Sequence, residues 1–528
     1  MRESLNGVDS GAWMLIALIL SSALMIPQLG DAFGGFHGMS EAYFTQLGQS
    51  LLDNPLKYPT RPDGSAQSDN ILLPYLLYVS FKVFGVSEAS ARFVVVAFTL
   101  AAIAAVYHIC KRLYGARTAA YASLILAATP MNVLVGRNVQ PDTVFVSLGL
   151  SAVCLFLKGG RRNTILAGAL AFLSFLAKLP GILFTIGIIA YVISEKRSDV
   201  LNDPRLKTFL VTSLLIMIPY LAYNLAFHQQ GFLSAVTSRV MLAASEEGSN
   251  NGPDMIAYET FYGLSPLIAL AFLAGLAYSI AKHRENNTLP LIFSAMFLLF
   301  FLVYNKHSYY ILPLAPFAAM IAANALAGIR EKRVETALMI LLVLSGAFYS
   351  LLMLCGNKYG YREYERLPGI YGEEDAAIAV SDHISDNFID LVTYYNPRAE
   401  VIRLKNVREG EDCLMPLDYT RPTYNLLHRS ELSLNALNED MRARLLERSA
   451  ASDVYALSFF GIVFSAEPAN QHFFTHGRLR MNRAKDVRGT GPVKLGEAPE
   501  LFLVKLKEGE RLYRREDGAY SIRGRAGF

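Results

Sequence analysis

Three acidic side chains in this sequence stand where helical or apolar segments begin, and a carboxylate in such a place could serve chemistry. Glu41 opens a short segment with a helical pattern, and Asp142 opens a long apolar run, so each could act as a general base. A plainer interpretation is a solvated carboxylate favoured by the helix dipole, with Asp142 paired to Arg137. Asp69 precedes the apolar segment 71–84, where it could cap a helix, bind a sugar hydroxyl, or hold a phosphate through a bridging cation.

Cationic side chains also border the apolar runs, and these could bind a phosphate. Lys306, His307 and Tyr309 lie between two such runs, and Lys178 interrupts another. An ammonium or guanidinium group at these places, including that of Arg137, could hold a phosphate by charge-assisted hydrogen bonds. Alternatively, the lysines extend to the membrane surface and the tyrosine belongs to an interfacial aromatic belt.

The elements that must position these groups are membrane helices. Of the 528 residues, 53% are hydrophobic and only 18% are charged, against about 25% in a soluble protein. A helix needs about 20 apolar residues to cross the hydrocarbon, and we predict about eleven spans, with residue 180 separating two short ones. The predicted spans are 12–28, 87–110, 118–136, 142–157, 163–177, 180–194, 208–228, 259–281, 288–304, 308–328 and 335–355.

Basic residues in alternate loops set the expected orientation. Five loops on one side of the predicted spans carry clusters of lysine and arginine, which is typical of the cytoplasmic face. The N-terminus then lies in the cytoplasm of a multi-pass cell-membrane protein, and the candidate site residues lie on the opposite, extracytoplasmic side. The clusters contain Lys111, Arg112 and Arg117; Lys158, Arg161 and Arg162; Lys196, Arg197, Arg205 and Lys207; Lys282 and Arg284; and Arg330, Lys332 and Arg333.

Two parts of the chain fall outside the spans. The first outer loop, residues 29–86, contains an amphipathic pattern at 39–52 and a short apolar stretch at 71–84, which we interpret as helices at the membrane surface. Residues 357–528 have the composition of a small soluble α/β domain. We therefore predict a polytopic α-helical membrane domain over residues 1–356 and an extracytoplasmic domain over 357–528.

Four local motifs resemble those of the GT-C membrane glycosyltransferases, in particular the superfamily of protein O-mannosyltransferases and lipid A aminoarabinose transferases. The resemblance runs from about residue 30 to residue 330. The motifs are SEAYF at 40–44, like the family's Asp-Glu-Ala-x-Tyr; FGVSEASARF at 84–93, like Phe-Gly-x-Ser-Glu-x-x-Ala-Arg-Leu; RNVQPD at 137–142, like Arg-x-x-x-x-Asp; and KHSYYILP at 306–313, like Lys-x-x-Tyr-Tyr-Leu-Leu-Pro.

Two positions depart from the family pattern. Ser40 stands where the family has the first residue of an Asp-Glu pair, and Asn70 follows Asp69 where many relatives have a lysine. Either Glu41 and Asp69 take over, with Lys306 or Arg137 at the phosphate, or the substrate differs.

The resemblance implies a donor sugar on a polyprenyl or dolichyl phosphate, an acceptor hydroxyl on a protein, lipid or glycan, and inversion at the anomeric carbon. It implies no cofactor, and the sequence neither requires nor excludes a divalent metal; nucleic acid is not an expected partner. Three other functions stay open: a transporter or flippase of a lipid-linked or small polar substrate, a ligase or polymerase that moves a whole glycan, and a structural or receptor protein.

Overall fold

The computed structural model describes most of the N-terminal two thirds of the chain and short segments of the remainder. The described residues are 10–27, 29–31, 33, 38–56, 58–60, 70–196, 200, 202–227, 260–282, 285–303, 308–357, 377–380, 393–394, 400–403, 423–428, 501–505, 511–514 and 520–523. The chain divides into two compact units, the first built mainly from Phe44–Cys355 together with Met1–Asp31, and the second from Ala32–Tyr43 with most of the chain after Gly356. Asp69, Lys306 and His307 lie outside the described residues.

The first unit is a bundle of helices. In chain order its elements, with α2 shared with the second unit, are α1 (Ser10–Met25), α2 (Gly38–Ser50), α3 (Leu72–Phe84), α4 (Glu88–Leu113), α5 (Ala116–Ala128), α6 (Pro130–Val135), α7 (Pro141–Lys158), α8 (Arg161–Ala177), the 3₁₀ helix η1 (Leu179–Gly181), α9 (Ile182–Lys196), α10 (Pro204–Phe227), α13 (Pro266–Lys282), η4 (Glu285–Asn287), α14 (Thr288–Val303), η5 (Ser308–Leu314), α15 (Ala315–Ala327) and α16 (Lys332–Asn357).

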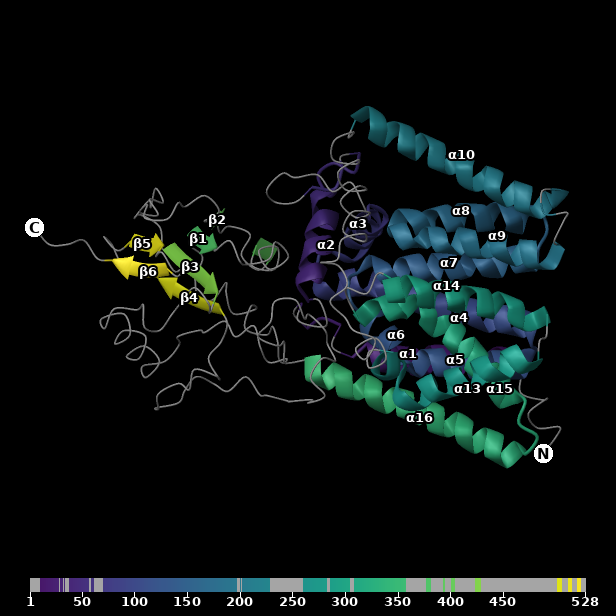
Figure 1. Cartoon of the computed structure of the whole chain (residues 1–528). Helices are drawn as coiled ribbons and strands as arrows, with labels where there is room; N and C mark the ends of the chain where they lie inside the picture. The colour runs from purple at the N-terminus through teal and green to yellow at the C-terminus, as the bar shows by residue number, and fades with distance from the viewer. Residues whose placement is uncertain are drawn as a thin grey trace, which may run out of the picture. The chain divides into compact units, whose positions relative to one another are not determined.

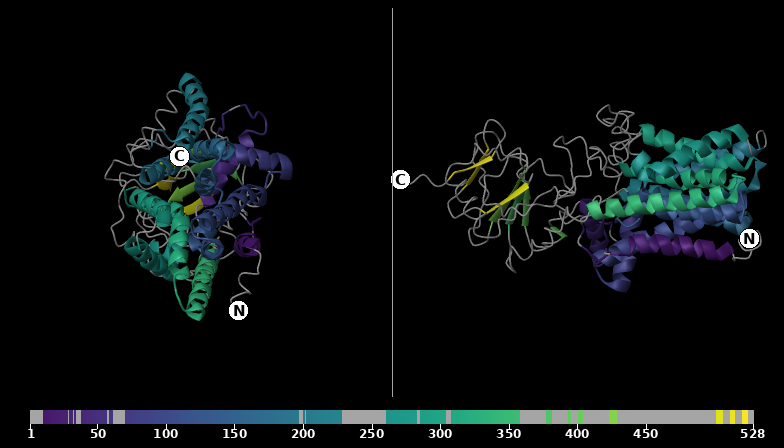
Figure 2. Two further views of the ribbon diagram at one scale, coloured as in Figure 1. Left: turned by 90° about the vertical axis from the view of Figure 1, so that its right-hand side faces the viewer. Right: turned by 90° about the horizontal axis from the view of Figure 1, so that it is seen from below.

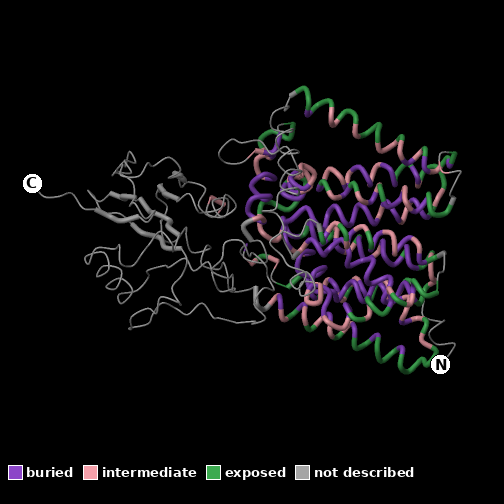
Figure 3. The backbone as a smooth tube through the Cα atoms, viewed as in Figure 1, coloured by how far each residue is buried: buried purple, intermediate pink, exposed green. Residues whose placement is uncertain are grey.

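Helices α4, α5, α7 and α15 form the centre of the bundle, where most residues are buried, while α10 and α16 lie at two opposite edges (Figures 1, 2 and 3). Phenylalanines from three helices fill part of the core: Phe184 of α9 contacts Phe293 of α14 and Phe317 of α15, and the latter two rings stack 4.7 Å apart. Gly149 of α7 makes room for this stack, since a Cβ there would lie 2.1 Å from the Phe184 ring.

The helices confirm a polytopic, mostly helical membrane protein. By length and composition, five of the described helices could cross a membrane: Glu88–Leu113, Pro141–Lys158, Pro204–Ala226, Tyr309–Ala327 and Lys332–Leu354. Six further apolar helices in the described part are shorter, among them Leu72–Phe84. Only 11% of the apolar window of α10 is buried, so most of its surface is available to lipid.

Helices form at both places where the sequence predicted them in the first outer loop. Helices α2 and α3 run crosswise at one end of the bundle (Figure 1). They pack closely at Gly48, where a Cβ would lie 2.7 Å from the Cβ of Leu77 and 3.0 Å from the Phe81 ring. The absence of a side chain at residue 48 therefore lets the two helix backbones approach.

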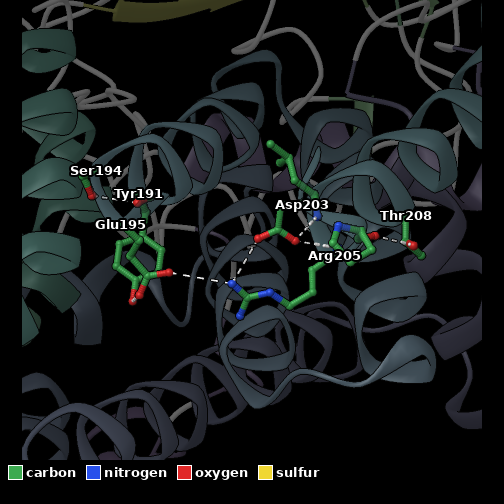
Figure 4. A network of polar contacts seen from close by, with 8 residues as sticks. Tyr191, Ser194, Glu195, Asp203, Arg205 and Thr208 are labelled. Carbon is green, nitrogen blue, oxygen red and sulfur yellow. Dashed lines mark hydrogen bonds and ion pairs between the residues drawn. The ribbon is translucent and has the colours of Figure 1, made fainter. Parts of the chain in front are cut away.

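Ion pairs join several of the predicted basic loops. Arg205, at the start of α10, contacts Asp203 at 3.2 Å and Glu195 of α9 at 3.8 Å, and Tyr191 also bonds Glu195 (Figure 4). The Arg205 guanidinium lies 5.7 Å from the ring of Phe156 at the end of α7. These contacts bring the ends of α7 and α9 to the start of α10, as expected for loops on one side of a membrane.

A second group of charges links two other helix starts. The buried carboxylate of Glu335, 1% exposed, bonds Arg117 at the start of α5 and Lys332 at 2.7 Å at the start of α16. Because Glu335 is buried, these two partly exposed cations compensate its charge, and the removal of either would leave the carboxylate with the other alone.

The second unit contains strands in its described part. Strands β1 (Ala377–Val380), β2 (Glu400–Arg403), β3 (Thr423–His428) and β4 (Leu501–Lys505) form a sheet in the order β2-β1-β3-β4, with β4 antiparallel to β3 and the other pairs parallel. Strands β5 (Arg511–Arg514) and β6 (Tyr520–Arg523) pair with each other. The α/β character predicted for the whole of 357–528 stays a prediction.

Candidate active site

A buried ion pair joins two of the residues that the sequence singled out. The Nζ atom of Lys178 donates to both carboxylate oxygens of Asp142, at 2.7 Å to Oδ1 and 2.9 Å to Oδ2. Asp142 is 2% exposed and Lys178 is 7% exposed. Charges this deeply buried are stable only when paired, so each group fixes the position of the other.

Local sequence explains where the two side chains lie. Pro141 occupies the first turn of α7, which suits a residue without an N–H, and it places Asp142 beside the positive end of the helix. Lys178 directly follows α8 and has an extended backbone (φ −160°, ψ 139°) before η1. Its side chain therefore does not continue the helical arrangement of the α8 side chains. The hydrogen bond from Ser174 of α8 to the Phe145 carbonyl of α7, 2.7 Å long, ties the two helices together beside the pair.

Gly181 makes the turn after Lys178 possible. A Cβ at Gly181 would lie 2.3 Å from the backbone carbonyl of Ser174, which is too close for any side chain. The Gly181 N–H also donates to the Lys178 carbonyl at 2.8 Å. The proline and glycine at positions 180 and 181, which separate the two predicted spans in the sequence, therefore also shape the turn that presents Lys178.

Two aromatic rings complete the surroundings of the lysine. Its Nζ lies 5.0 Å from the ring centre of Tyr309 and 4.7 Å from that of Tyr310, both in η5. The two rings contact each other edge to face at 4.8 Å. A cation within about 6 Å of an aromatic face is stabilised by the ring quadrupole, so the tyrosines support the ammonium that Asp142 neutralises.

The segment that leads into α7 is held by several backbone and hydroxyl contacts. Thr99 of α4 donates to the Gly136 carbonyl at 3.0 Å, and Thr143 of α7 donates to the Val135 carbonyl at 3.2 Å. A Cβ at Gly136 would lie 2.7 Å from the Thr99 hydroxyl oxygen. This turn, residues 136–140, therefore has little freedom and presents Asp142 in a defined position.

The other predicted site residues fall in different places. Glu41 is fully buried in the first turn of α2, so the interpretation of a solvated carboxylate is wrong. Glu41 belongs to the second compact unit, whereas Asp142, Lys178 and Tyr309 belong to the first. Arg137 is half-buried in the turn before α7. The roles of Asp69, Lys306 and His307 stay predictions.

Sequence reasoning considered Asp142 and Lys178 separately and did not predict that they pair. They are 36 residues apart on different helices, and only the packing of α7 on α8 brings them together. It also missed Arg92, a buried residue of the motif at 84–93, which donates to the Leu29 carbonyl at 2.9 Å and to that of Asp31. Arg92 therefore holds the start of the first outer loop against α4.

Among the residues that the structure describes, no three His, Cys, Asp or Glu side chains are grouped as metal ligands would be. Whether a metal takes part is left to experiment.

Solved structures share this fold. ArnT from Cupriavidus metallidurans, in the apo state, has a TM-score of 0.59 at 14% identity, over 79% of this chain and 92% of that one. The same protein bound to undecaprenyl phosphate has the same score and identity over 85% and 95%. The oligosaccharyltransferase AglB from Archaeoglobus fulgidus, in complex with an inhibitory peptide and a dolichol-phosphate, has a TM-score of 0.52 at 15% identity, over 74% of this chain and 64% of that one.

The chain therefore shares the fold of ArnT and of the oligosaccharyltransferase AglB. Residues 68–223 match the family model of dolichyl-phosphate-mannose-protein mannosyltransferases. The matched region contains both Asp142 and Lys178. No curated protein sequence is significantly similar to this chain.

Proposed function

We propose that this protein transfers a sugar from a polyprenyl or dolichyl phosphate to an acceptor hydroxyl, with inversion at the anomeric carbon. The acceptor oxygen forms a bond to the anomeric carbon while the bond from that carbon to the phosphate oxygen breaks. The lipid phosphate leaves with the electron pair, and the acceptor proton passes to a carboxylate. No redox partner is needed for this step.

The observation that carries the proposal is the buried pair of Asp142 and Lys178 beside Tyr309 and Tyr310. Lys178 supplies positive charge for the leaving phosphate, and a preorganised cation in a site of low polarity stabilises a developing anion strongly. Asp142 orients the ammonium through both of its oxygens. Arg137, and Lys306 and His307 if the loop before η5 brings them near, would add to the positive charge.

Two carboxylates are candidates for the base that takes the acceptor proton: Glu41 and Asp142. A positioned base contributes about 10²–10⁴-fold to the rate. Asp142 already accepts two hydrogen bonds from Lys178, so both of its oxygens are engaged while the pair is intact. Asp142 can therefore take a proton only when the ammonium moves toward the donor phosphate; otherwise Glu41 is the base and Asp142 a positioning residue.

The finer topology is also part of the proposal. We infer eleven membrane crossings in a cell (cytoplasmic) membrane, with α2 and α3 at the surface, the N-terminus in the cytoplasm, and residues 357–528 on the outer side. In support, the basic loops flank the ends of α7 and α8 that are opposite to Asp142 and Lys178. Helix α7 separates Asp142 from Lys158 by about 24 Å at 1.5 Å per residue, which is close to the thickness of the hydrocarbon.

The test is transfer of radiolabelled sugar from a panel of polyprenyl-phosphate sugars to native membrane extracts. We compare the wild-type protein with Asp142→Asn, Lys178→Met and Glu41→Gln, and use Glu195→Gln, at the basic end, as a matched control. The proposal expects transfer by the wild type and the control, and a loss of at least about 100-fold in Lys178→Met. Full activity of Lys178→Met would overturn the assignment of the phosphate site.

Acceptor analogues of different acidity distinguish the two possible roles of Asp142, as the base or as a positioning residue. If Asp142 is the base, an acceptor analogue with a more acidic hydroxyl restores part of the activity of Asp142→Asn, because less proton removal is then required. If Asp142 only positions Lys178, the analogue gives no recovery and the KM for the donor rises. A wild-type protein that is folded but transfers no sugar would favour the transporter or flippase function.

A further inference from the structure

Two buried amide side chains lie beside the candidate active site and have atoms without hydrogen-bond partners. The Oε1 atom of Gln140 and the Nδ2 atom of Asn132 are both inaccessible to solvent, and within the described part of the chain neither has a partner. The residues are 3% and 4% exposed. Unpartnered buried polar atoms are rare in native proteins and call for an explanation such as a bound ligand.

The positions of these amides connect them to the ion pair. Gln140 is the residue before α7, two positions from Asp142, and two residues span at most about 7 Å. Asn132 lies on α6, which contacts both α7 and η5, and α7 in turn contacts η5. The three elements that carry Asn132, Asp142 and Tyr310 therefore meet at one place.

The chemistry of the two atoms is complementary to one kind of group. A carboxamide offers an acceptor and two donors, and a sugar hydroxyl can donate to Gln140 Oε1 and accept from Asn132 Nδ2. Neither amide carries a charge, so neither is suited to hold the phosphate, which Lys178 can neutralise. Thr99 and Thr143 donate to the backbone carbonyls of Gly136 and Val135, which precede Gln140 in the chain.

We propose that Asn132 and Gln140 form a subsite that binds hydroxyl groups of the transferred sugar, next to the Asp142–Lys178 pair. This inference rests on the proposed function, because it assumes a donor with a sugar on a lipid phosphate. It assigns the neutral amides to the sugar and the ion pair to the phosphate, so the two parts of one donor are recognised by different residues.

The test compares two kinds of lipid. Purified protein is titrated with undecaprenyl phosphate and with undecaprenyl phosphates that carry mannose, glucose or aminoarabinose. The variants are Asn132→Leu and Gln140→Met, which keep the approximate volume and remove the polar atoms. Ser294→Ala is the matched control, because its hydroxyl oxygen on α14 is also buried and, among the described residues, has no partner.

We expect the wild type to bind one sugar-bearing lipid more tightly than the bare phosphate. Each variant should lose about tenfold in affinity for that lipid, the effect of one hydrogen bond, and keep its affinity for the bare phosphate. The control should keep both affinities. Thermal stability of the variants should be unchanged or higher, since an unpartnered buried amide has been removed.

Two other outcomes would contradict either the sugar subsite or the proposed function. If the variants bind both lipids as the wild type does, or weaken both equally, the amides do not recognise the sugar and the subsite is wrong, while the proposed function remains. If the wild type binds neither lipid and transfers no sugar, the proposed function itself fails.

Discussion

Burying the Asp142–Lys178 pair costs free energy that two apolar residues of similar size would not cost. Removing two charges from water costs several kcal/mol for each, and apolar residues of similar volume often stabilise a fold as well or better. Tyr309 and Tyr310 recover part of this cost through the contact of their rings with the ammonium. A buried and preorganised cation is suited to a reaction in which a phosphate leaves.

A double-mutant cycle separates stability from chemistry at this pair. Asp142→Leu or Lys178→Met alone leaves one buried charge unpaired, so each should lower the free energy of unfolding by about 3–5 kcal/mol. The double variant should regain most of that stability, because no charge remains, yet it should transfer no sugar. Unfolding in detergent and the transfer assay measure the two quantities. A double variant whose loss of stability equals the sum of the two single losses would show that the side chains are not coupled, which would contradict this expectation.

At the scale of single elements, short turns between helices place the functional side chains. The tight turn at Gly181 fixes where Lys178 leaves α8, and the held turn at residues 136–140 fixes the start of α7. Neither turn depends on the helix propensity of its neighbours. Each depends on a glycine beside which no Cβ fits.

Gly181→Ala should therefore impair the site without removing any functional group. The new Cβ would meet the Ser174 backbone, so η1 must shift and carry Lys178 away from Asp142. We expect transfer to fall by about 100-fold, as a displacement near 1 Å commonly costs, while the protein still inserts into the membrane. Gly30→Ala is the control for loss of a turn glycine, since nothing lies within 4 Å of its Cβ position; equal loss in both variants would contradict the prediction.

Helix α10 is held to the first outer loop by a tyrosine. The Tyr58 hydroxyl donates to Asn224 Oδ1, and its ring stacks on Tyr223 at 6.1 Å. Burial raises the pKa of the Tyr58 hydroxyl above its ordinary value of 10.0. The folded state thus favours the protonated phenol, and its contribution to stability is present below pH 10 and is lost as the pH rises above that value.

Tyr58→Phe should remove this dependence on pH and lower the free energy of unfolding by about 1–2 kcal/mol, because Asn224 Oδ1 is left buried without its donor. Unfolding measured from neutral pH to above about pH 10 tests both parts. A second variant that combines Tyr58→Phe with Asn224→Leu should regain stability. A Tyr58→Phe protein with the alkaline instability of the wild type would place the cause elsewhere.

At the scale of the whole molecule, the charge of the loops and the position of the ion pair support the proposed orientation. The basic ends of α7, α9 and α10 come together through Arg205, and the ion pair of the site lies at the opposite ends of α7 and α8. In the proposed orientation, the site lies on the side of the membrane away from the cytoplasm.

Labelling of single cysteines tests this orientation. In a background without native cysteines, Leu56→Cys in the first outer loop, 87% exposed, should react with a membrane-impermeant maleimide in intact cells. Arg162→Cys, in the basic first turn of α8, should react only after the cells are permeabilised. The reverse pattern would invert the proposed topology and place the site in the cytoplasm.

The amino-acid sequence by itself determined the class of fold and the residue types of the site. Apolar length and loop charge are local properties, so they predicted the membrane helices, and the motif at 137–142 indicated Asp142. Lys178 was recognised only as an isolated cation in an apolar run, and Glu41 was as compatible with solvent as with burial. These ambiguities arise because burial depends on what packs around a side chain and not on its neighbours in sequence.

The tertiary structure alone decided which groups meet. The packing of α7 on α8 joins Asp142 to Lys178 across 36 positions, and η5 brings two tyrosine rings to the same ammonium. It also left Gln140 and Asn132 buried with unpartnered atoms within the described residues, which no sequence pattern reveals. Helix packing determines which side chains far apart in the sequence contact each other. The amino-acid sequence of each segment by itself determines whether that segment forms a helix and enters a membrane.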